Sequence, residues 1–386
     1  MSERDIRLEI DGYIETRREL DVLKKYGFDY TAQRGRAETL ISGIHPKRLR
    51  LRVSEIRQET ASTKSFRLVS ADGRLPPFQA GQYVNLFVEI DGVRTSRPYS
   101  IASPPNQTGY YELAVRRVPD GFVSSYLLDE VRVGAELAGS GPAGNFYHHP
   151  VFHGRDLVFL AGGSGITPFM SMIRETTDRG LDRRIHLFYG SRIPEDVIYK
   201  DELEERAARH DHFRLHTVIS EPPPGYTGRT GFLTADLLSD LAAPAGDKTF
   251  YLCGPEVMYR FCRAELDKMG VAPRRVRSEG YGPPADVTRE PGWPEDVAAE
   301  ARFTVRVRNG REFEARAGET LLSSLERAGI TVPSSCRSGE CSLCRIKMIS
   351  GRVFQPRGAR VRKSDRRFGW IHSCLAYPLE DLEILI

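Results

Sequence analysis

Four cysteines near the carboxyl end restrict this chain more than any other feature of its sequence. Cys336, Cys341 and Cys344 follow the spacing C-x4-C-x2-C, and Cys374 follows after 29 intervening residues. One class of [2Fe–2S] site has this spacing, in which four thiolates hold two irons. A zinc site is the main alternative, because Cys341 and Cys344 alone would pass for half of a zinc pair. Zinc ribbons usually place two such pairs some distance apart, so the spacing predicts the iron–sulfur cluster.

The composition bounds the class of protein. A chain of 386 residues suggests two or three domains at about 150 residues each. With 40% hydrophobic and 28% charged residues, it is neither a multi-span membrane protein nor disordered throughout. Its net charge of +4 is too small to indicate nucleic acid binding. The amino terminus lacks the apolar core of a secretory signal, so we expect a cytoplasmic protein without a membrane span or a disulfide framework.

The pattern of apolar, polar and turn-forming residues changes along the chain and suggests five parts. Short alternating runs broken by Gly and Pro predict a small antiparallel β-barrel or sandwich. Apolar runs alternating with helical stretches then predict a parallel sheet covered by helices. A Pro-, Gly- and acid-rich linker precedes an Asn309–Gly310 hairpin, a helix and the cysteine loop, which together predict an α+β domain. The expected parts are a helical extension 1–45, the barrel 46–153, the α/β domain 154–283, the linker 284–299 and the cysteine domain 300–386.

Two glycine-containing turns lie where parallel strands should end. AGGSGITP, residues 161–168, follows one apolar run, and CGP, residues 253–255, follows another. Glycines let a backbone approach a ligand closely, and open α/β sheets bind ligands at the carboxyl ends of their strands. A tight strand-to-helix turn explains the first motif equally well on its own, since it lacks the third glycine of the usual dinucleotide fingerprint. The two turns together indicate a nucleotide site.

A third motif, RPYS at residues 97–100, closes the predicted barrel strands. An arginine beside a tyrosine offers a cation for phosphate and a flat ring for stacking. Gly121 and Ser124, at the start of an apparent helix, offer a second place for an anion. A structural edge strand is the alternative interpretation, so the motif by itself indicates a planar, phosphorylated ligand only modestly.

In combination, these motifs resemble the ferredoxin–NADP reductase superfamily followed by a plant-type ferredoxin. FQAGQYV at residues 78–84, RPYS, AGGSGITP and CGP occur in the order of that family. The arrangement is similar to reductases of the phthalate dioxygenase and phenylacetyl-CoA epoxidase types, and it covers residues 46–386. The resemblance implies a flavin barrel, an NAD(P)-binding domain and a β-grasp ferredoxin domain.

The resemblance also implies roles for matching residues. Arg97 would bind a flavin phosphate, Tyr99 would stack on the isoalloxazine, and Ser100 would hydrogen-bond near flavin N5. Cys253 would lie beside the nicotinamide, and Glu279 near the flavin, so that Ser100, Cys253 and Glu279 are the expected catalytic residues. The expected cofactor-binding residues are Arg97, Pro98, Tyr99, Ser100, Gly121, Ser124, Gly162, Gly163, Gly165, Thr167, Ser191, Arg192, Cys253, Gly254, Pro255 and Tyr281. Cys336, Cys341, Cys344 and Cys374 would hold the cluster.

Some choices stay open at this point. GPAGNF, residues 141–146, looks more like FAD-containing than FMN-containing relatives, so we expect FAD. Ser191 and Arg192 follow the second parallel strand and are placed to bind a 2′-phosphate, yet relatives using NADH also carry an arginine there. We therefore expect NADH or NADPH, with a slight preference for NADH. The stretch 352–367 carries seven basic residues against Asp365 and is either a solvated loop or a docking patch for an acidic partner.

The expected activity follows from what each carrier accepts. A nicotinamide releases a hydride and a [2Fe–2S] cluster takes one electron, so a flavin must stand between them. We expect an NAD(P)H-dependent oxidoreductase for electron transport, feeding a separate acceptor protein such as an oxygenase. Reverse flow, from a low-potential donor to NAD(P)+, is the alternative, since such a cluster lies near about −400 mV. A non-enzymatic interaction module with a relic redox core is a third hypothesis, which the intact cysteines and RPYS disfavour.

Overall fold

The computed structural model describes residues 10–27, 35–44, 46–242, 244–280, 282–308 and 310–386. By its internal contacts the chain forms two compact units, Met1–Lys47 and Arg48–Ile386. The first unit contains α1 (Tyr13–Lys25) and α2 (Arg36–Ile44), and neither helix buries a residue. The sequence predicted α1, which ends just before Gly27 takes a left-handed conformation.

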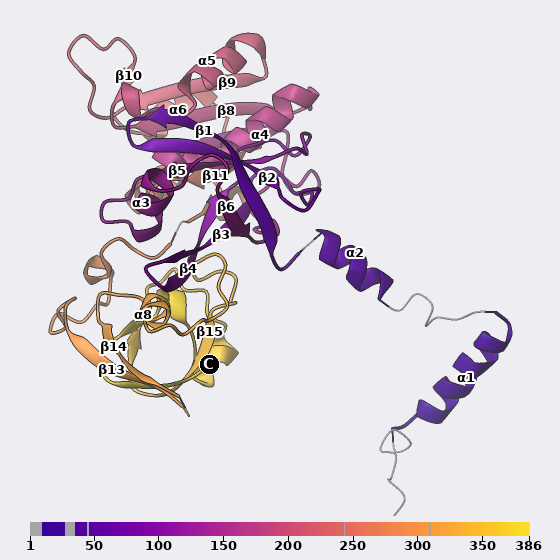
Figure 1. Cartoon of the computed structure of the whole chain (residues 1–386). Helices are drawn as coiled ribbons and strands as arrows, with labels where there is room; N and C mark the ends of the chain where they lie inside the picture. Colours follow the sequence, from indigo (N-terminus) through magenta and orange to yellow (C-terminus); the bar gives the residue numbers. More distant parts are fainter. Residues whose placement is uncertain (1–9, 28–34, 45, 243, 281, 309) are drawn as a thin grey trace, which may run out of the picture. The chain divides into compact units, whose positions relative to one another are not determined.

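The second unit begins with an antiparallel sheet that closes on itself (Figure 1). Its order is β4-β3-β6-β1-β2-β5, and an antiparallel bridge between Ile101 and Leu113 joins its two ends. Alternate residues of β1 are buried, as a half-buried strand requires, and they form one core with the inner faces of the other strands. The elements are β1 (Leu49–Thr60), β2 (Thr63–Ser70), β3 (Tyr83–Ile90), β4 (Val93–Ser100), β5 (Tyr111–Arg116), α3 (Phe122–Asp129) and β6 (Glu136–Gly139).

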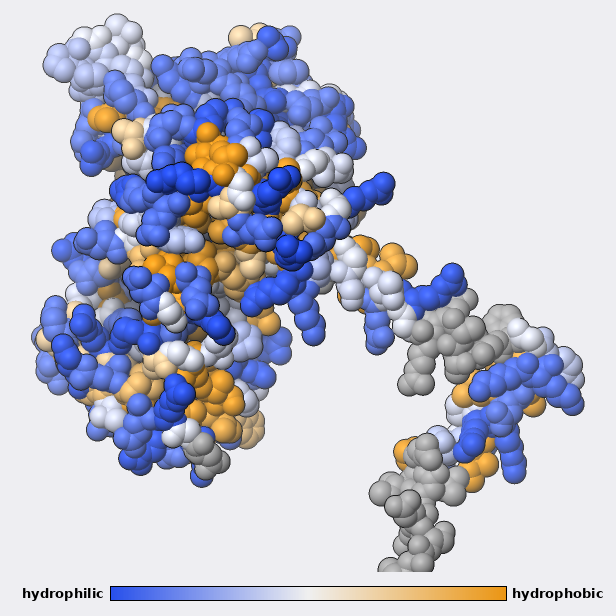
Figure 2. Space-filling model, viewed as in Figure 1, coloured by the Kyte–Doolittle hydropathy of each residue, from blue (hydrophilic) through white to orange (hydrophobic). Residues whose placement is uncertain are grey.

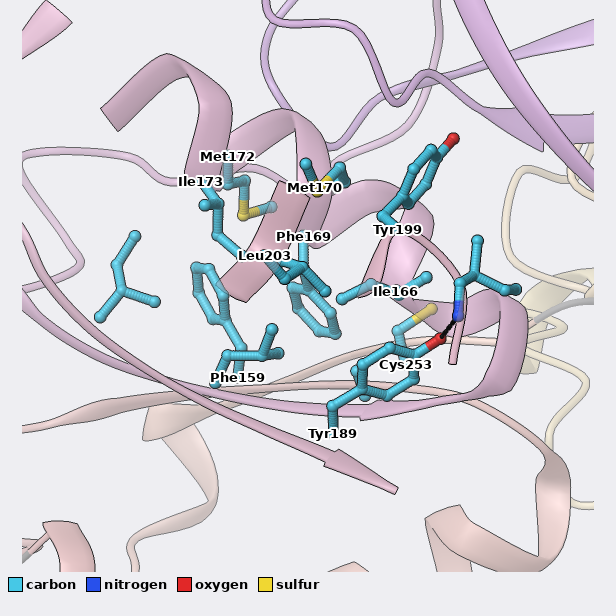
Figure 3. Packing of buried hydrophobic residues seen from close by; sticks show 14 of the residues in the cluster. Phe159, Ile166, Phe169, Met170, Met172, Ile173, Tyr189, Tyr199, Leu203 and Cys253 are labelled. Carbon is cyan, nitrogen blue, oxygen red and sulfur yellow. Dashed lines mark hydrogen bonds between the residues drawn. The ribbon is translucent and has the colours of Figure 1, made fainter. Parts of the chain in front are cut away.

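A six-stranded sheet with only parallel pairs follows, in the order β10-β9-β8-β7-β11-β12. Two separate cores cover its faces, one including α4 and the other including α6 and α7. In the first core the rings of Phe159 and Phe169 stack with centroids 4.7 Å apart (Figure 3). The elements are β7 (Asp156–Gly162), η3 (Gly163–Gly165), α4 (Ile166–Arg179), β8 (Arg184–Ser191), η4 (Pro194–Asp196), α5 (Lys200–Arg209), β9 (Phe213–Ile219), β10 (Arg229–Thr230), α6 (Ala235–Ala242), β11 (Thr249–Cys253), α7 (Glu256–Lys268), η5 (Pro273–Arg275) and β12 (Val276–Glu279).

The last part is a mixed sheet of order β14-β13-β19-β15-β17 whose core includes α8. The expected hairpin is present as the antiparallel pair β13 and β14, although Asn309 of its turn lies outside the described residues. The elements are η6 (Val287–Arg289), β13 (Arg302–Val307), β14 (Glu312–Arg316), α8 (Leu321–Arg327), β15 (Arg345–Ser350), β16 (Val353–Phe354), α9 (Lys363–Arg367), β17 (Trp370–His372), η7 (Ser373–Leu375), β18 (Tyr377–Pro378) and β19 (Leu382–Leu385).

These three sheets confirm the predicted fold class, a β-barrel, a parallel α/β domain and an α+β domain in that order. The domain boundaries that the sequence suggested stay predictions. Hydrophilic residues cover most of the visible surface of residues 48–386, with smaller apolar patches between them (Figure 2). None of the described helices combines the length and the apolar character that a bilayer span requires.

The barrel and the parallel sheet are joined by a buried ion-pair network around Arg174 on α4. Its guanidinium donates to Glu112 of β5 at 2.7 Å and to the backbone carbonyl of Ala102 at 3.1 Å. A bidentate pair with Glu202 of α5 has distances of 2.8 and 2.5 Å. The side chains of Arg174 and Glu112 are only 7% and 1% exposed. This network fixes α4, and with it the glycine turn before α4, against the barrel.

Candidate functional site

A cavity of 570 Å³ is lined by strands of the barrel and by helices and loops of the α/β and C-terminal parts of the second unit. Its volume lies within the range of roughly 300–1,000 Å³ usual for small-molecule sites. The lining residues that the sequence predicted to bind cofactor are Arg97, Pro98, Tyr99, Ser100, Gly121, Ser124 and Thr167. Cys374, one of the four predicted cluster ligands, lies on the wall of the same cavity. A ligand in this cavity would therefore stand beside the cysteine site.

Strand β4 presents the RPYS residues to this cavity. Tyr99 is half-buried and packs against the barrel core, so one side of its ring stays available for stacking. The guanidinium of Arg97 donates to the hydroxyl of Thr95 at 2.7 Å and to the carbonyl of Ser96 at 2.8 Å. Burial, followed by the positive charge of Arg337, lowers the pKa of Arg97 to about 10. An anion in the cavity would offset both effects, which fits a phosphorylated, planar ligand such as a flavin.

Gly121 and Ser124 form a tight turn at the start of α3. A side chain at Gly121 would overlap Ser124 Oγ, so the turn requires glycine. The Ser124 hydroxyl accepts from the backbone N–H of Val118 at 3.2 Å and lies 3.4 Å from the carbonyl of Gly121. The Ser124 hydroxyl therefore bridges backbone groups within the turn, and Gly121, which has no side chain, lines the cavity with its backbone.

The two glycine turns pack against each other at the ends of neighbouring parallel strands. Residues Ala161 of β7 and Cys253 of β11 are direct partners in the ladder. A side chain at Gly162 would overlap the sulfur of Met258, and one at Gly254 would lie 3.2 Å from the Cα of Gly162. The packing of the turns thus requires these glycines whether or not a nucleotide is bound. Their use in nucleotide binding stays a prediction.

Cys253 lies in the interior of the α/β domain. Its side chain is fully buried in the core that contains Ile166, Phe169 and Tyr189 (Figure 3). The hydroxyl of Tyr189 accepts from the backbone N–H of Ile198 at 3.1 Å and donates to the carbonyl of Gly163 at 2.9 Å. Burial places the Cys253 sulfur behind the glycine turn, so a direct contact with a nicotinamide ring stays a prediction.

At the end of β8, the expected ribose site carries an acid that the sequence reasoning missed. Arg192 forms an exposed ion pair with Glu221, which follows β9, at 3.4 Å. The hydroxyl of Ser191 donates to the carbonyl of Ile193 at 3.0 Å. A carboxylate here repels a 2′-phosphate and accepts a hydrogen bond from a ribose hydroxyl. The pair therefore favours NADH over NADPH.

The four C-terminal cysteines are free thiols that meet as two pairs. Cys336 is hydrogen-bonded to Cys341, and Cys344 to Cys374. The backbone N–H groups of Cys341 and Ser338 also donate to the Cys336 sulfur, at 3.3 and 3.5 Å. These hydrogen bonds, together outweighing burial, lower the pKa of Cys336 to about 4. Amides aimed at a sulfur stabilise its thiolate, which is the form that binds metal.

This arrangement fits two irons better than one zinc. A mononuclear zinc site needs three or four converging ligands, whereas a [2Fe–2S] cluster needs two thiolates at each iron. Two pairs of thiols, three of them from the loop before β15 and Cys374 from η7, satisfy the second requirement.

A second cavity, of 490 Å³, also reaches the cysteine loop. Cys336 and Cys341 line it together with Glu279, Glu340 and Arg360. Glu279 is 9% exposed and hydrogen-bonded to Ser100, while its Oε2 atom is buried without a hydrogen-bond partner. The structure thus brings Ser100 and Glu279 together as expected. Tyr281, the remaining residue predicted near the flavin, lies outside the described residues.

The burial of Glu279 makes stability depend on pH. Desolvation, reinforced by the charge of Glu340, raises the pKa of Glu279 from 4.5 to about 8. The folded state then holds a proton that the unfolded state releases, so the free energy of unfolding falls as the pH rises from 4.5 through 8. Glutamine carries no charge to bury. As the pH rises from 5 to 9, we therefore expect the free energy of unfolding of Glu279→Gln to increase relative to that of the wild type by roughly 3–5 kcal/mol.

Melting temperatures of the wild type and E279Q across that pH range check this prediction. The exposed Glu130 provides a matched control, and E130Q should follow the wild type throughout. A difference in melting temperature between E279Q and the wild type that is the same at every pH would contradict the prediction.

Comparison with known proteins identifies the three parts. Residues 50–148 match the oxidoreductase FAD-binding domain, residues 159–264 the oxidoreductase NAD-binding domain, and residues 305–379 the 2Fe-2S iron-sulfur cluster binding domain. The chain is 30% identical over 348 residues to the glycine betaine monooxygenase reductase subunit of Pseudomonas aeruginosa, covering 86% of this chain and 94% of that one.

Two further similarities support the same assignment. The NADH oxidoreductase HCR of Escherichia coli is 30% identical over 333 residues, which cover 86% of this chain and 96% of that protein. Among solved structures, phthalate dioxygenase reductase superposes with a TM-score of 0.68 at 27% identity, covering 88% of this chain and 98% of that one. FAD, NADH and a [2Fe–2S] cluster are therefore the cofactors; the sequence predicted FAD and the cluster, and left NADH or NADPH open with a preference for NADH.

Proposed function

The chain belongs to the ferredoxin–NADP reductase superfamily, among flavin reductases with a C-terminal [2Fe–2S] ferredoxin domain, and we propose that it supplies electrons to a separate oxygenase. It is an oxidoreductase that passes electrons from NADH through the flavin to the cluster. When bound, the flavin accepts a hydride and releases single electrons, which is the conversion that the cluster requires. The full-length relative is named as a monooxygenase reductase subunit, which supports the oxygenase partner.

The observation that carries this proposal is the shared wall of the flavin cavity. Tyr99 and Arg97 of the barrel line it, and so does Cys374 of the cysteine site. The protein's contribution is to position the flavin ring against Tyr99 and beside a cluster ligand, in a cavity that lies between domains. No nucleophile or general base is required for this step. We also propose a cytoplasmic location, where NADH is available and thiolates stay reduced.

An anaerobic NADH titration of the protein loaded with FAD, iron and sulfide tests the function. We expect the visible flavin absorbance to bleach and a one-electron spin signal of the cluster to follow. Neither signal in a fully loaded sample would contradict the proposed function.

The acceptor is expected to meet a basic surface next to the cysteine loop. We call this surface the basic face; it consists of the exposed residues Arg357, Arg360, Arg362, Lys363, Arg366 and Arg367. The backbone N–H of Arg360 donates to the carbonyl of Gly339 at 3.2 Å, and Arg345 holds α9 through Asp365 at 3.3 Å. Leu343 is 54% exposed and Phe368 is 70% exposed.

Cys341 is exposed at the same place, so a cluster ligand, apolar side chains and basic charge occur together. Protein interfaces commonly combine an apolar centre with a polar rim, and complementary charge speeds encounter. We infer that the acceptor presents acidic residues around its own redox centre.

Charge reversal tests the basic face. We expect R366E/R367E to lower kcat/KM for an acidic one-electron acceptor protein by about 10- to 100-fold at low salt, because steering by charge is lost. Raising the salt concentration should reduce this difference in kcat/KM, since screening also weakens the attraction between the wild-type protein and the acidic acceptor.

The control variant carries the same charge change elsewhere on the same domain. R311E/R316E alters exposed arginines on and before β14, at the opposite edge of the sheet from β17. An equal loss in both variants, or a wild-type rate that does not depend on salt, would contradict the docking proposal while leaving the NADH titration unaffected.

A further inference from the structure

A buried polar cluster connects the ferredoxin domain to the flavin barrel. Thr95 of β4 lies at its centre, and its hydroxyl donates to Glu326 of α8 at 2.9 Å. The same oxygen accepts from Arg97 at 2.7 Å and from Arg337 at 3.1 Å. Arg337 also forms an ion pair with Glu326. One donor and two acceptor positions are all that a hydroxyl has, so Thr95 is fully used in holding the two arginines together.

The charges in this cluster do not balance. Arg337, Thr95 and Glu326 are 5%, 7% and 9% exposed, so the cluster is nearly dry. Two guanidinium groups, those of Arg97 and Arg337, face a single carboxylate. Burial lowers the pKa of Arg97, and the positive charge of Arg337 lowers it further. A buried excess positive charge is costly unless an anion joins it.

The unmatched charge faces the flavin cavity. Arg97 and Arg337 both line it, and the Nε atom of Arg337 is buried without a hydrogen-bond partner. Of the described residues that line this cavity, four are arginines and one, Asp120, is acidic. The two other arginines already have partners, Arg116 with Asp196 at 3.3 Å and Arg117 with Asp129 at 2.5 Å. The available donors are thus those of the Arg97 and Arg337 pair.

We propose that Arg337 is a second phosphate-binding residue of the flavin, contributed by the ferredoxin domain and acting together with Arg97. An anionic phosphate between the two guanidinium groups removes the excess charge and supplies an acceptor for the unpaired N–H. The proposal rests on the flavin occupying this cavity, as the proposed function requires. Arg337 directly follows the cluster ligand Cys336, so the flavin phosphate also fixes the cysteine loop in place.

This arrangement links two equilibria. A ligand that contacts both domains stabilises their docked state, and docking in turn strengthens ligand binding by the same factor. Flavin binding therefore holds the cluster loop against the barrel, and a chain without flavin has a more weakly docked ferredoxin domain.

Replacing Arg337 by glutamine tests the contact with phosphate. The probes are FAD, FMN and riboflavin, and the affinity of each is measured by fluorescence titration of the full-length protein after removal of flavin with the cluster retained. We expect R337Q to bind FAD and FMN about 10- to 100-fold more weakly, since a charged hydrogen bond is lost. Riboflavin lacks phosphate, so its affinity should change little.

Glu326→Gln separates phosphate binding from a purely structural role. This variant removes the ion pair of Arg337 but keeps its positive charge, so we expect FMN to keep its advantage over riboflavin. A loss by the same factor for all three flavins in R337Q, or an FMN-to-riboflavin ratio lowered equally by E326Q, would overturn the proposal. Failure of the wild type to bind any flavin would instead contradict the proposed function.

Discussion

Replacing Cys341 by serine should stop electron delivery while NADH still reduces the flavin. Cys341 is exposed and pairs with Cys336, so the substitution removes one ligand of the predicted cluster without opening a hole in the core. Loss of an outer partner of a metal ligand typically costs about 10- to 100-fold, and loss of a ligand costs more. We therefore expect reduction of the acceptor protein to fall more than about 100-fold, with flavin bleaching by NADH retained.

The matched control is Cys262→Ala. Cys262 is fully buried on α7, in the core opposite the flavin side, where burial raises the pKa of its thiol to about 12. A thiol that stays protonated does not bind metal, so this variant should keep both iron content and acceptor reduction. Zinc in place of iron in the wild type, or full acceptor reduction by C341S, would contradict the cluster assignment.

Replacing Arg174 by methionine should cost about 3–5 kcal/mol of stability, because a broken buried ion pair leaves unpaired charge behind. Glu112 would lose its 2.7 Å partner while staying 1% exposed, and Glu202 would lose a bidentate partner. These interactions raise the pKa of Arg174 above its ordinary value, so wild-type Arg174 stays charged at every accessible pH. A loss of this size lowers a melting temperature by about 6–20 °C.

Arg179 provides the control on the same helix. Its ion pair with Glu175 has a 51% exposed guanidinium, and exposed pairs contribute about 0–1 kcal/mol. R179M should therefore melt within a few degrees of the wild type. Equal melting temperatures for R174M and R179M would show that the network does not hold the barrel and the α/β domain together. Release of flavin fluorescence on heating reports the same event from the cofactor side.

Features that depend on local pattern were predictable from the sequence. Alternation in β1 and the apolar run of β7 follow from which faces these strands bury, and the three sheets confirm the fold class. The cysteine spacing was enough to predict the [2Fe–2S] site, because three of its four ligands come from one loop. Similarly, the four RPYS residues are consecutive at the end of β4, and all of them line the same cavity.

Features that depend on packing between distant segments were not predictable. Arg337 and Thr95 are 242 residues apart, and no periodicity or motif indicates that they share a hydrogen bond. Glu221 beside Arg192 is a similar case, since the two residues follow different strands. For Cys253, the motif predicts a contact with the nicotinamide, which stays a prediction, and only the structure shows that its side chain lies in the core.

Three of the four predicted cluster ligands line one of two cavities. Cys374 lines the flavin cavity, whereas Cys336 and Cys341 line the second cavity near the basic face. A redox centre that receives and releases electrons through the same surface must release its electron donor before it can contact the electron acceptor. With the docking that we propose, electrons would enter the cluster from the side of Cys374 and leave it from the side of the exposed Cys341, so the acceptor would not have to displace the flavin.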